Sequence, residues 1–199
     1  MMASVDNVPD PQASAGPERV SEVRIAPMRR RHLRGVVAIE ERTNHRPWSS
    51  ALFMGELRMP TSRFYVVAME DHEVVGFCGL MLVADEGHLT NVAVHPDRRR
   101  RSIAAQLMLV TMRRARELSL IGVTLEVRMT NTVAQELYRR FGFVPGGVRR
   151  NYYADVGEDA LIMWAHDIAT DCYAERLEGI ESMLPSPLSV DPRCGEELT

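Results

Sequence analysis

The amino-acid sequence predicts a mixed α/β fold of the α+β type, in which helices cover a largely antiparallel sheet. Some segments alternate between apolar and polar residues, as strands do. Between them lie segments in which apolar residues recur every three to four positions, as in helices. Along the chain these segments follow the order strand, helix, helix, three strands, helix, strand, helix and strand. The 199 residues, 45% of them hydrophobic, are enough for one domain with a substantial core.

The first half of the chain holds six predicted elements. They are a strand at 23–28, helices at 30–43 and 50–57, and strands at 63–70, 73–83 and 88–94. Pro47 and a capping serine mark the start of the second helix. The two longest strands flank the turn pair Asp71-His72, so we expect them to form an antiparallel hairpin. Pro96 ends the strand that follows, because proline cannot donate to a sheet ladder.

The second half of the domain alternates between helices and strands. The predicted helices span 103–118 and 131–143, and the predicted strands span 123–128 and 159–167. The first of these helices is long and amphipathic. Gly142 ends the second helix, because glycine favours the position just past a helix end.

Composition predicts acidic tails around this domain. Residues 1–22 are rich in proline, alanine, serine and acids and are expected to be disordered. Residues 169–199 form a second acidic extension, which leaves residues 23–168 mildly basic although the whole chain carries a net charge of −3. A basic domain suits an anionic ligand.

The C-terminal extension is predicted to contain one short helix. Its apolar residues recur at helical spacing, at Tyr173, Leu177, Ile180 and Leu184. This amphipathic helix either packs on its own domain or docks a partner or a second subunit. Beyond Pro185 the chain is expected to be disordered.

Several functional classes are disfavoured by what the sequence lacks. The three cysteines are far apart without a CxxC pair, and the six histidines show no paired spacing, so we expect no metal site and a cytoplasmic protein. The apolar runs are too short to span a membrane, and the N-terminus lacks the basic start and apolar segment of a signal peptide.

The segment DRRRRSIAAQ, residues 97–106, is predicted to bind phosphate. It joins a strand to a helix through a tight polar turn, where unpaired backbone N–H groups and the helix dipole attract anions. Ser102, Ala104 and Ala105 leave room above the helix start. The alternatives are a solvated charge run and a nucleic-acid patch, which the lack of interleaved aromatic residues disfavours.

Residues 99–104, Arg-Arg-Arg-Ser-Ile-Ala, resemble the motif R/Q-x-x-G-x-G/A of the GNAT superfamily of N-acetyltransferases. Ser102 replaces the middle glycine, which costs about 1–2 kcal/mol if that position is left-handed. Further segments resemble, in order and spacing, those of RimI-type ribosomal-protein-alanine N-acetyltransferases: TNVAVHPD, VTLEVRMTN, AQELYRRFGF, GVRRNYY and EDALIMW. The resemblance covers roughly residues 23–168 and implies the GNAT fold, with helices on both faces of the sheet.

The resemblance also implies acetyl-CoA as the co-substrate and assigns the residues that hold it. The backbone of one strand is expected to pair with the cofactor and to support an oxyanion. Asn131 is also expected to cap a helix. The predicted cofactor-binding residues are Val92, Ala93, Val94, Arg99, Arg100, Arg101, Ser102, Ile103, Ala104, Ala105 and Asn131.

Two side chains are predicted to carry the chemistry. Alternation in VTLEVR puts Glu126 on one face of a rigid strand, where a general base could sit, and the resemblance implies this role. The alternative is a surface glutamate paired with Arg128. The resemblance makes Tyr138 the acid that protonates the leaving thiolate, whereas the alternative is a packed tyrosine with its hydroxyl at the rim.

The predicted function is acetyl-CoA-dependent Nα-acetylation of a protein N-terminus by direct attack on the thioester. The resemblance implies the N-terminal alanine of small-subunit ribosomal protein number eighteen as substrate. Trp48, Tyr152 and Tyr153 are candidates for the peptide groove or for plain packing. The alternatives are acetylation of lysines or small amines, a non-catalytic CoA-binding or partner-docking module, and nucleic-acid binding through the arginines.

Overall fold

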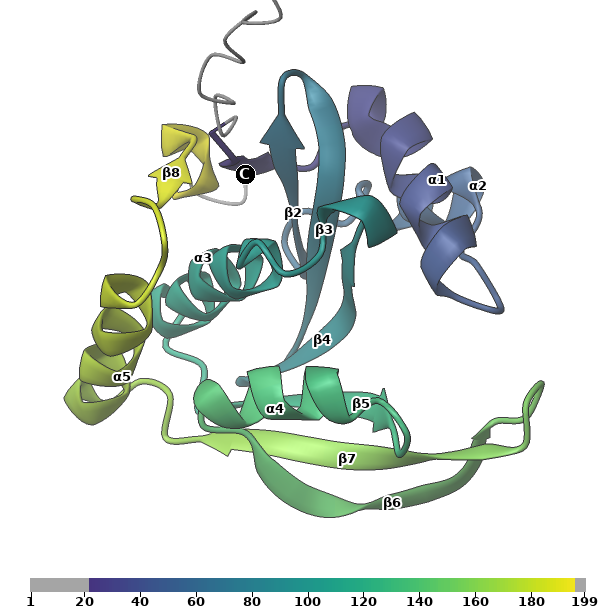
Figure 1. The fold of residues 1–199 in the computed structure, drawn as a ribbon. Helices are drawn as coiled ribbons and strands as arrows, with labels where there is room; N and C mark the ends of the chain where they lie inside the picture. The colour runs from purple at the N-terminus through teal and green to yellow at the C-terminus, as the bar shows by residue number, and fades with distance from the viewer. Residues whose placement is uncertain (1–21, 196–199) are drawn as a thin grey trace, which may run out of the picture.

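The computed structural model describes residues 22–195. The disorder predicted for residues 1–22 therefore falls, except at Glu22, outside the described residues. Within them, one eight-stranded sheet runs in the order β6-β7-β5-β4-β3-β2-β1-β8 (Figure 1). No helix among residues 22–195 has the length and apolarity needed to cross a bilayer. The predicted class, a mixed and mostly antiparallel sheet with helices, is confirmed.

The elements follow the predicted order, with two added strands. The strands are β1 Arg24–Pro27, β2 Arg63–Glu70, β3 Glu73–Val83, β4 Glu86–Val94, β5 Gly122–Arg128, β6 Val144–Tyr153, β7 Glu158–His166 and β8 Ser189–Val190. The helices are α1 Leu33–Thr43, α2 Ser50–Glu56, α3 Ile103–Glu117, α4 Thr132–Arg140 and α5 Asp171–Ser182. Short 3-10 turns lie at Arg30–His32, Pro96–Arg98 and Pro192–Cys194.

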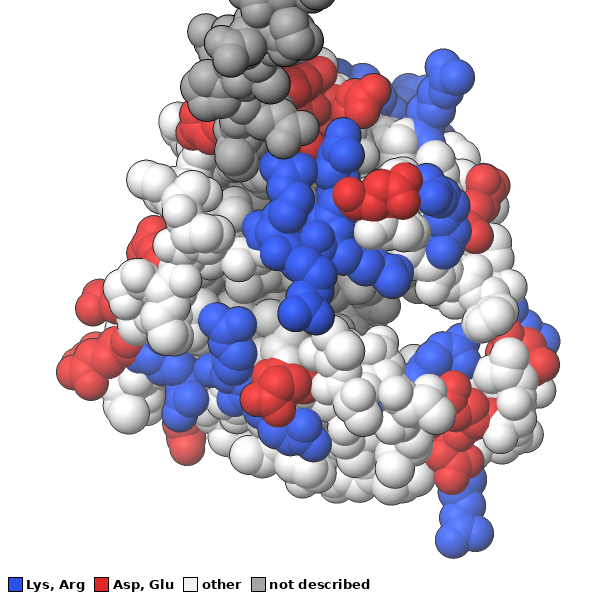
Figure 2. Space-filling model, viewed as in Figure 1, with Lys and Arg blue, Asp and Glu red and all other residues white. Residues whose placement is uncertain are grey.

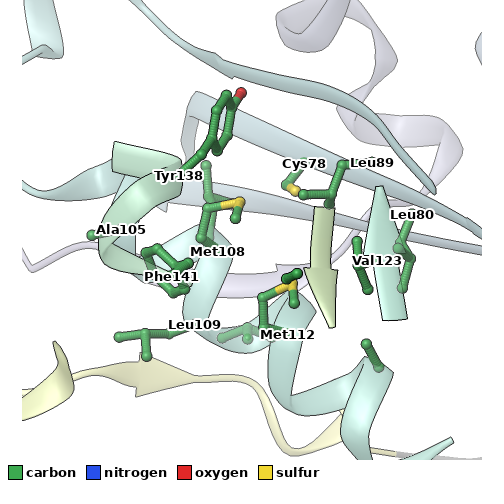
Figure 3. Packing of buried hydrophobic residues seen from close by; sticks show 14 of the residues in the cluster. Cys78, Leu80, Leu89, Ala105, Met108, Leu109, Met112, Val123, Tyr138 and Phe141 are labelled. Atoms are coloured by element: carbon green, nitrogen blue, oxygen red, sulfur yellow. The ribbon is translucent and has the colours of Figure 1, made fainter. Parts of the chain in front are cut away.

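Helices cover both faces of the sheet, as the family resemblance implied. On one face α3 and α4 bury a large cluster that includes Met108, Met112 and Phe141 (Figure 3). On the other face α1 and α2 bury a smaller cluster around Phe53 and Phe77, whose rings meet edge to face. Each helix lies on the sheet because its apolar side chains recur on one side.

The sheet separates in its middle. The parallel strands β4 and β5 pair only over Glu86–His88 and Gly122–Thr124, although both continue past these residues. Beyond His88, β4 still pairs with β3 on its other side. One edge of β4 therefore faces a gap in the sheet, with backbone groups that β5 does not pair (Figure 1).

The predicted helix of the C-terminal extension packs on its own domain. The apolar face of α5 lies against α3 (Figure 1), and Tyr173, Leu177 and Ile180 are buried there. The Tyr173 hydroxyl donates to the backbone carbonyl of Phe141 over 2.7 Å. These apolar side chains are therefore used within the chain, which disfavours the prediction that they dock a partner.

The structure corrects the sequence prediction at two strands. β6 was not predicted, because its residues are exposed almost throughout and show no buried-exposed alternation. The disorder predicted beyond Pro185 is wrong for residues 186–195. There β8 pairs in parallel with β1, and Cys194 is buried in the main cluster. Both strands form because a partner strand is available: β7 follows β6 in a hairpin, whereas β1 lies far from β8 in the chain.

Candidate active site

A cavity of about 1250 Å³ opens where β4 and β5 separate. Its walls come from the open edge of β4, the turn before α3, the end of β5, α4 and the end of α1. In Figure 2 basic side chains gather beside the hollow between the start of α3 and α4. All of them are arginines, because the sequence contains no lysine. The cavity therefore combines an open strand edge with a positively charged rim.

The turn before α3 has the backbone expected of a phosphate site. Arg100 and Ser102 have φ values of 64° and 57°, both left-handed. Ser102 occupies the N-cap of α3, yet its side chain makes no capping hydrogen bond. The first N–H groups of a helix lack helical partners and attract anions. The residues at this helix start that line the cavity are Ser102, Ile103, Ala104 and Ala105.

Replacing Ser102 with glycine is expected to raise the free energy of unfolding by about 1 kcal/mol, because glycine adopts the left-handed region without a Cβ clash. Chemical denaturation measures the change. Ser119→Gly is the matched control, since Ser119 also has a left-handed φ of 56° but does not line the cavity. Both variants should gain similar stability. A loss confined to Ser102→Gly would contradict the expectation and indicate that the hydroxyl stabilises the turn.

Three of the four consecutive arginines, Arg98, Arg99 and Arg100, line the cavity. The buried carboxylate of Glu70 holds Arg98 and Arg101, with Arg98 Nε 2.8 Å and an Arg101 guanidinium nitrogen 2.5 Å away. The hydrogen bond from Arg101, followed by the charges of Arg101 and Arg98, lowers the pKa of Glu70.

This arrangement sets one predicted site residue apart from the others. Arg101 is predicted to bind the cofactor, but its guanidinium bonds Glu70 at the end of β2 and Arg101 does not line the cavity. The sequence prediction missed this because Glu70 lies 31 positions away and only the packing of β2 beside the turn brings it close. Every other predicted site residue lines the same cavity.

Glu126 projects from β5 into the cavity and is nearly buried, with 7% of its side chain exposed. His88 Nε2 lies 3.1 Å from Oε2, and an Arg149 guanidinium nitrogen lies 3.0 Å from Oε1. The hydrogen bond from His88, aided by the charges of His88 and Arg149, lowers the pKa of Glu126 although burial opposes this. The alternative pairing with Arg128 is wrong, because Arg128 bonds Glu158 over 3.1 Å.

The sequence analysis did not predict that His88 and Arg149 contact Glu126. His88 lies on β4 in register with Thr124, two residues before Glu126 on β5. Residues two apart on a strand share a face, so the β4–β5 pairing brings His88 to the same side as Glu126. Arg149 comes from β6, which β7 links to β5. Both contacts depend on strand pairings that cannot be predicted from local sequence patterns.

Tyr138 lies on α4, with its ring buried 5.9 Å from the Phe143 ring and its side chain lining the cavity. Figure 3 shows its hydroxyl pointing away from Met108 and Phe141. That hydroxyl makes no hydrogen bond to the residues described. Burial, together with Cys78 and Tyr153, raises the pKa of Tyr138, so the phenol keeps its proton at neutral pH.

The remaining predicted residues have mixed outcomes. Asn131 caps α4, its side-chain oxygen accepting from Ala134 N over 3.2 Å, and it also lines the cavity. Of the three candidates for a peptide groove, Tyr153 lines the cavity, beneath the Arg128 guanidinium. Tyr152 is exposed and does not line the cavity, and Trp48 packs on Phe53, as the packing alternative predicts.

Comparison with known proteins adds independent evidence. Residues 28–143 match the family described as "Acetyltransferase (GNAT) family". A putative [ribosomal protein bS18]-alanine N-acetyltransferase of Bacillus subtilis is 39% identical over 137 residues, covering 69% of this chain and 91% of that protein. The [ribosomal protein bS18]-alanine N-acetyltransferase of Salmonella typhimurium is 35% identical, covering 63% of this chain and 84% of the relative.

Solved structures agree with this assignment. The ribosomal-protein-S18-alanine N-acetyltransferase from Escherichia coli superposes with a TM-score of 0.67 at 28% identity, covering 73% of this chain and 94% of that one. Ard1 from Thermoplasma volcanium superposes with a TM-score of 0.66 at 28% identity, covering 71% of this chain and 95% of the other. The chain therefore belongs to the GNAT family and is an acetyl-CoA-dependent N-acetyltransferase.

Proposed function

We propose that this enzyme acetylates the N-terminal α-amine of a protein, and that its substrate is the N-terminal alanine of ribosomal protein bS18. The observation that carries the proposal is a nearly buried, ionised carboxylate in the same cavity as a protonated phenol and an open strand edge. The printed names of the relatives support the substrate. An enzyme that acts on a ribosomal protein works in the cytoplasm, which is the location we propose.

Acetyl-CoA supplies the activated acetyl group, and the residues around the cavity are suited to hold it. Arg99 and Arg100, together with the free N–H groups at the start of α3, attract the phosphates. The backbone of Val92, Ala93 and Val94 borders the cavity on the side where β5 offers no partner. These groups can hydrogen-bond the amides of the cofactor arm and support the oxyanion.

Glu126 is proposed as the general base. As the amine nitrogen attacks the thioester carbon, it becomes strongly acidic, and Glu126 takes its proton. Even a carboxylate of lowered pKa accepts this proton readily. Such a base does not deprotonate a lysine ammonium with a pKa of about 10.4, whereas an α-ammonium, at about 7.7–8.0, loses its proton to water near neutral pH. This difference favours α-amines over lysines.

Tyr138 is proposed as the general acid. The leaving thiolate has a pKa of roughly 8–9, by analogy with cysteine, and therefore leaves more easily when it is protonated. Tyr138 lines the cavity, its hydroxyl makes no hydrogen bond to any residue in the range 22–195, and the raised pKa keeps its proton in place. The carbon–sulfur bond breaks as the carbon–nitrogen bond forms, with one proton going to Glu126 and one coming from Tyr138.

The lowered pKa of Glu126 and the pKa of the substrate amine together determine how kcat/KM depends on pH. Because the pKa of Glu126 is lowered, the base is already ionised throughout the range from pH 5.5 to 9.5. We expect kcat/KM for an alanine peptide to rise with pH and level off near the pKa of the α-amine, about 7.7–8.0. Initial rates across this range measure the profile. A rise that continues beyond pH 9 would contradict it, because that is the behaviour of a lysine acceptor.

Turnover assays test the proposed function directly. The purified enzyme is given acetyl-CoA and a free-amine peptide that begins with alanine and contains no lysine, and both thiol release and peptide mass are followed. An N-terminally blocked lysine peptide and a polyamine are the competing acceptors. The enzyme contains no lysine, so acetylation of its own lysine side chains cannot contribute to the signal.

Three outcomes separate the candidate functions. Acetylation of the alanine terminus alone supports the proposal. Turnover of the lysine peptide or the polyamine, without turnover of the alanine peptide, replaces it with a side-chain or small-amine acetyltransferase. Binding of acetyl-CoA with no turnover of any acceptor would instead indicate a binding module.

A further inference from the structure

We propose that Thr90 and Asn91, on β4, form a pair of hydrogen-bond acceptors that binds the N-terminal amine of the substrate and the first peptide N–H that follows it. This inference rests on the proposed function, because it concerns how the same site recognises an α-amine. Both residues line the cavity that also contains Glu126. Neither belongs to the residues proposed to hold acetyl-CoA.

A β-bulge places these two consecutive residues on the same side of the sheet. Leu89 pairs with Leu80 and Asn91 pairs with Gly79, so Thr90 is an extra residue in β4. Leu89 before the pair and Val92 after it both pack in the cluster beneath α3. Thr90 and Asn91 therefore both face the opposite side of the sheet, which carries α1 and α2.

Glu126 projects to the same side as this pair. Its neighbour Leu125 is buried in the cluster on the α3 side, so alternation along β5 turns Glu126 the other way. The bulge begins just past His88, the last residue of β4 that pairs with β5. The two acceptors and the proposed base thus border the gap from its two opposite strands.

The hydrogen bonds around Thr90 leave its hydroxyl oxygen only as an acceptor toward the cavity. Glu56, 2.6 Å from Arg63 Nε in an ion pair, only accepts hydrogen bonds. The Tyr65 hydroxyl therefore donates its single proton to Glu56 over 3.0 Å, and burial raises its pKa so that this proton is retained. Thr90 Oγ1, 3.0 Å from the Tyr65 oxygen, must then be the donor in that bond. Only lone pairs of Thr90 remain for the cavity.

Gly79 leaves the space that the contact between Tyr65 and Thr90 requires. A Cβ added to Gly79 would lie 2.2 Å from Cε1 of Tyr65 and 2.7 Å from Oγ1 of Thr90. No side chain fits there while Tyr65 reaches Thr90. Glycine at position 79 thus permits the hydrogen-bond chain that orients the threonine hydroxyl.

Asn91 supplies the second acceptor. Its Oδ1 is buried and has no hydrogen-bond partner among the residues described. A buried carbonyl oxygen without a donor is unfavourable, so a donor brought by a ligand gains the full hydrogen bond. Asn91 follows Thr90 in the chain and lines the same cavity.

The chemistry of a protein N-terminus matches these acceptors. A neutral α-amine carries two N–H groups, and the first peptide nitrogen, with its N–H, is the third atom further along the chain. Acceptors on consecutive residues can engage both, while Glu126 takes the proton released on attack. A lysine side chain has no peptide N–H near its amine, so the pair discriminates against lysine by leaving one acceptor unpaired.

Two substitutions remove one acceptor each, Thr90→Val and Asn91→Ala. We expect each to lower kcat/KM for the alanine peptide about tenfold, with the Kd for acetyl-CoA unchanged, because one hydrogen bond to the substrate is lost. Thr90→Ser should restore most of the activity. Thr124→Val is the matched control, since the Thr124 hydroxyl bonds Met163 O and does not line the cavity, and it should retain full activity.

A double-mutant cycle tests the proton count. Tyr65→Phe frees the Thr90 proton and is expected to lower kcat/KM about two- to threefold when Thr90 is present. In the Thr90→Val background the same change should have no further effect, because the coupling passes through the threonine hydroxyl. A purely structural role of Tyr65 would instead reduce activity equally in both backgrounds.

The outcomes distinguish this inference from the proposed function. The inference alone is overturned by the following result. The unaltered enzyme acetylates the alanine peptide, and Thr90→Val and Asn91→Ala both retain the same kcat/KM and the same preference for the alanine peptide over the lysine peptide. If the unaltered enzyme acetylates no α-amine, both fail. Thermal melting of each variant is measured alongside, and Asn91→Ala decides the matter if Thr90→Val does not fold.

Discussion

Replacing Glu126 with glutamine is expected to lower kcat for the alanine peptide by a factor of about 100 to 1,000, the range typical of a lost general base. Glutamine has nearly the same shape but cannot accept the proton of the attacking amine. Its side chain still fills the space between His88 and Arg149. The Kd for acetyl-CoA should stay within about twofold, because the phosphate turn is untouched. Steady-state kinetics and calorimetric titration measure the two quantities.

A second carboxylate on the neighbouring strand provides the control. Glu158 bonds Arg128 at 3.1 Å, as Glu126 bonds Arg149, but Glu158 does not line the cavity. Glu158→Gln removes the same charge near the site and should leave kcat within about threefold, since a partly exposed ion pair contributes little. If both variants lose activity equally, the effect is one of charge, and Glu126 is not the base.

Tyr138→Phe is expected to lower kcat by a factor of about 10 to 100, because the thiolate then leaves without a proton. Phenylalanine keeps the ring beside Phe143, so the melting temperature should change little. The hydroxyl makes no hydrogen bond to the residues described, so its removal breaks no protein contact. The measurement is kcat at saturating acetyl-CoA and peptide, together with a thermal melt.

Another buried tyrosine separates catalysis from stability. Tyr173 donates to Phe141 O over 2.7 Å and does not line the cavity. Tyr173→Phe should cost about 1 kcal/mol of unfolding free energy, because a buried carbonyl loses its donor, while kcat stays unchanged. The two tyrosines are thus expected to give opposite patterns. Unchanged kcat in Tyr138→Phe would mean that the thiolate leaves without an acid.

The sequence by itself determined the elements and the faces they present. Alternation in β5 correctly put Glu126 opposite Leu125, and helical spacing correctly marked the buried side of α5. The motif at Arg99–Ala104 marked Ser102 as the position where a left-handed backbone would disfavour serine, and Ser102 has a left-handed φ of 57°. These features depend on backbone preferences and on side-chain periodicity within a few residues, so they can be read locally.

Only the tertiary structure decided which groups meet. Strand pairings brought His88 and Arg149 to Glu126, and β2 supplied the carboxylate that bonds Arg101, which does not line the cavity. β6 and β8 exist because β7 and β1 offer partner edges. The bulge at Thr90 appears only in the register of β4 against β3. Most of these contacts join residues far apart in the chain, and all of them depend on the register of paired strands rather than on the pattern within one element.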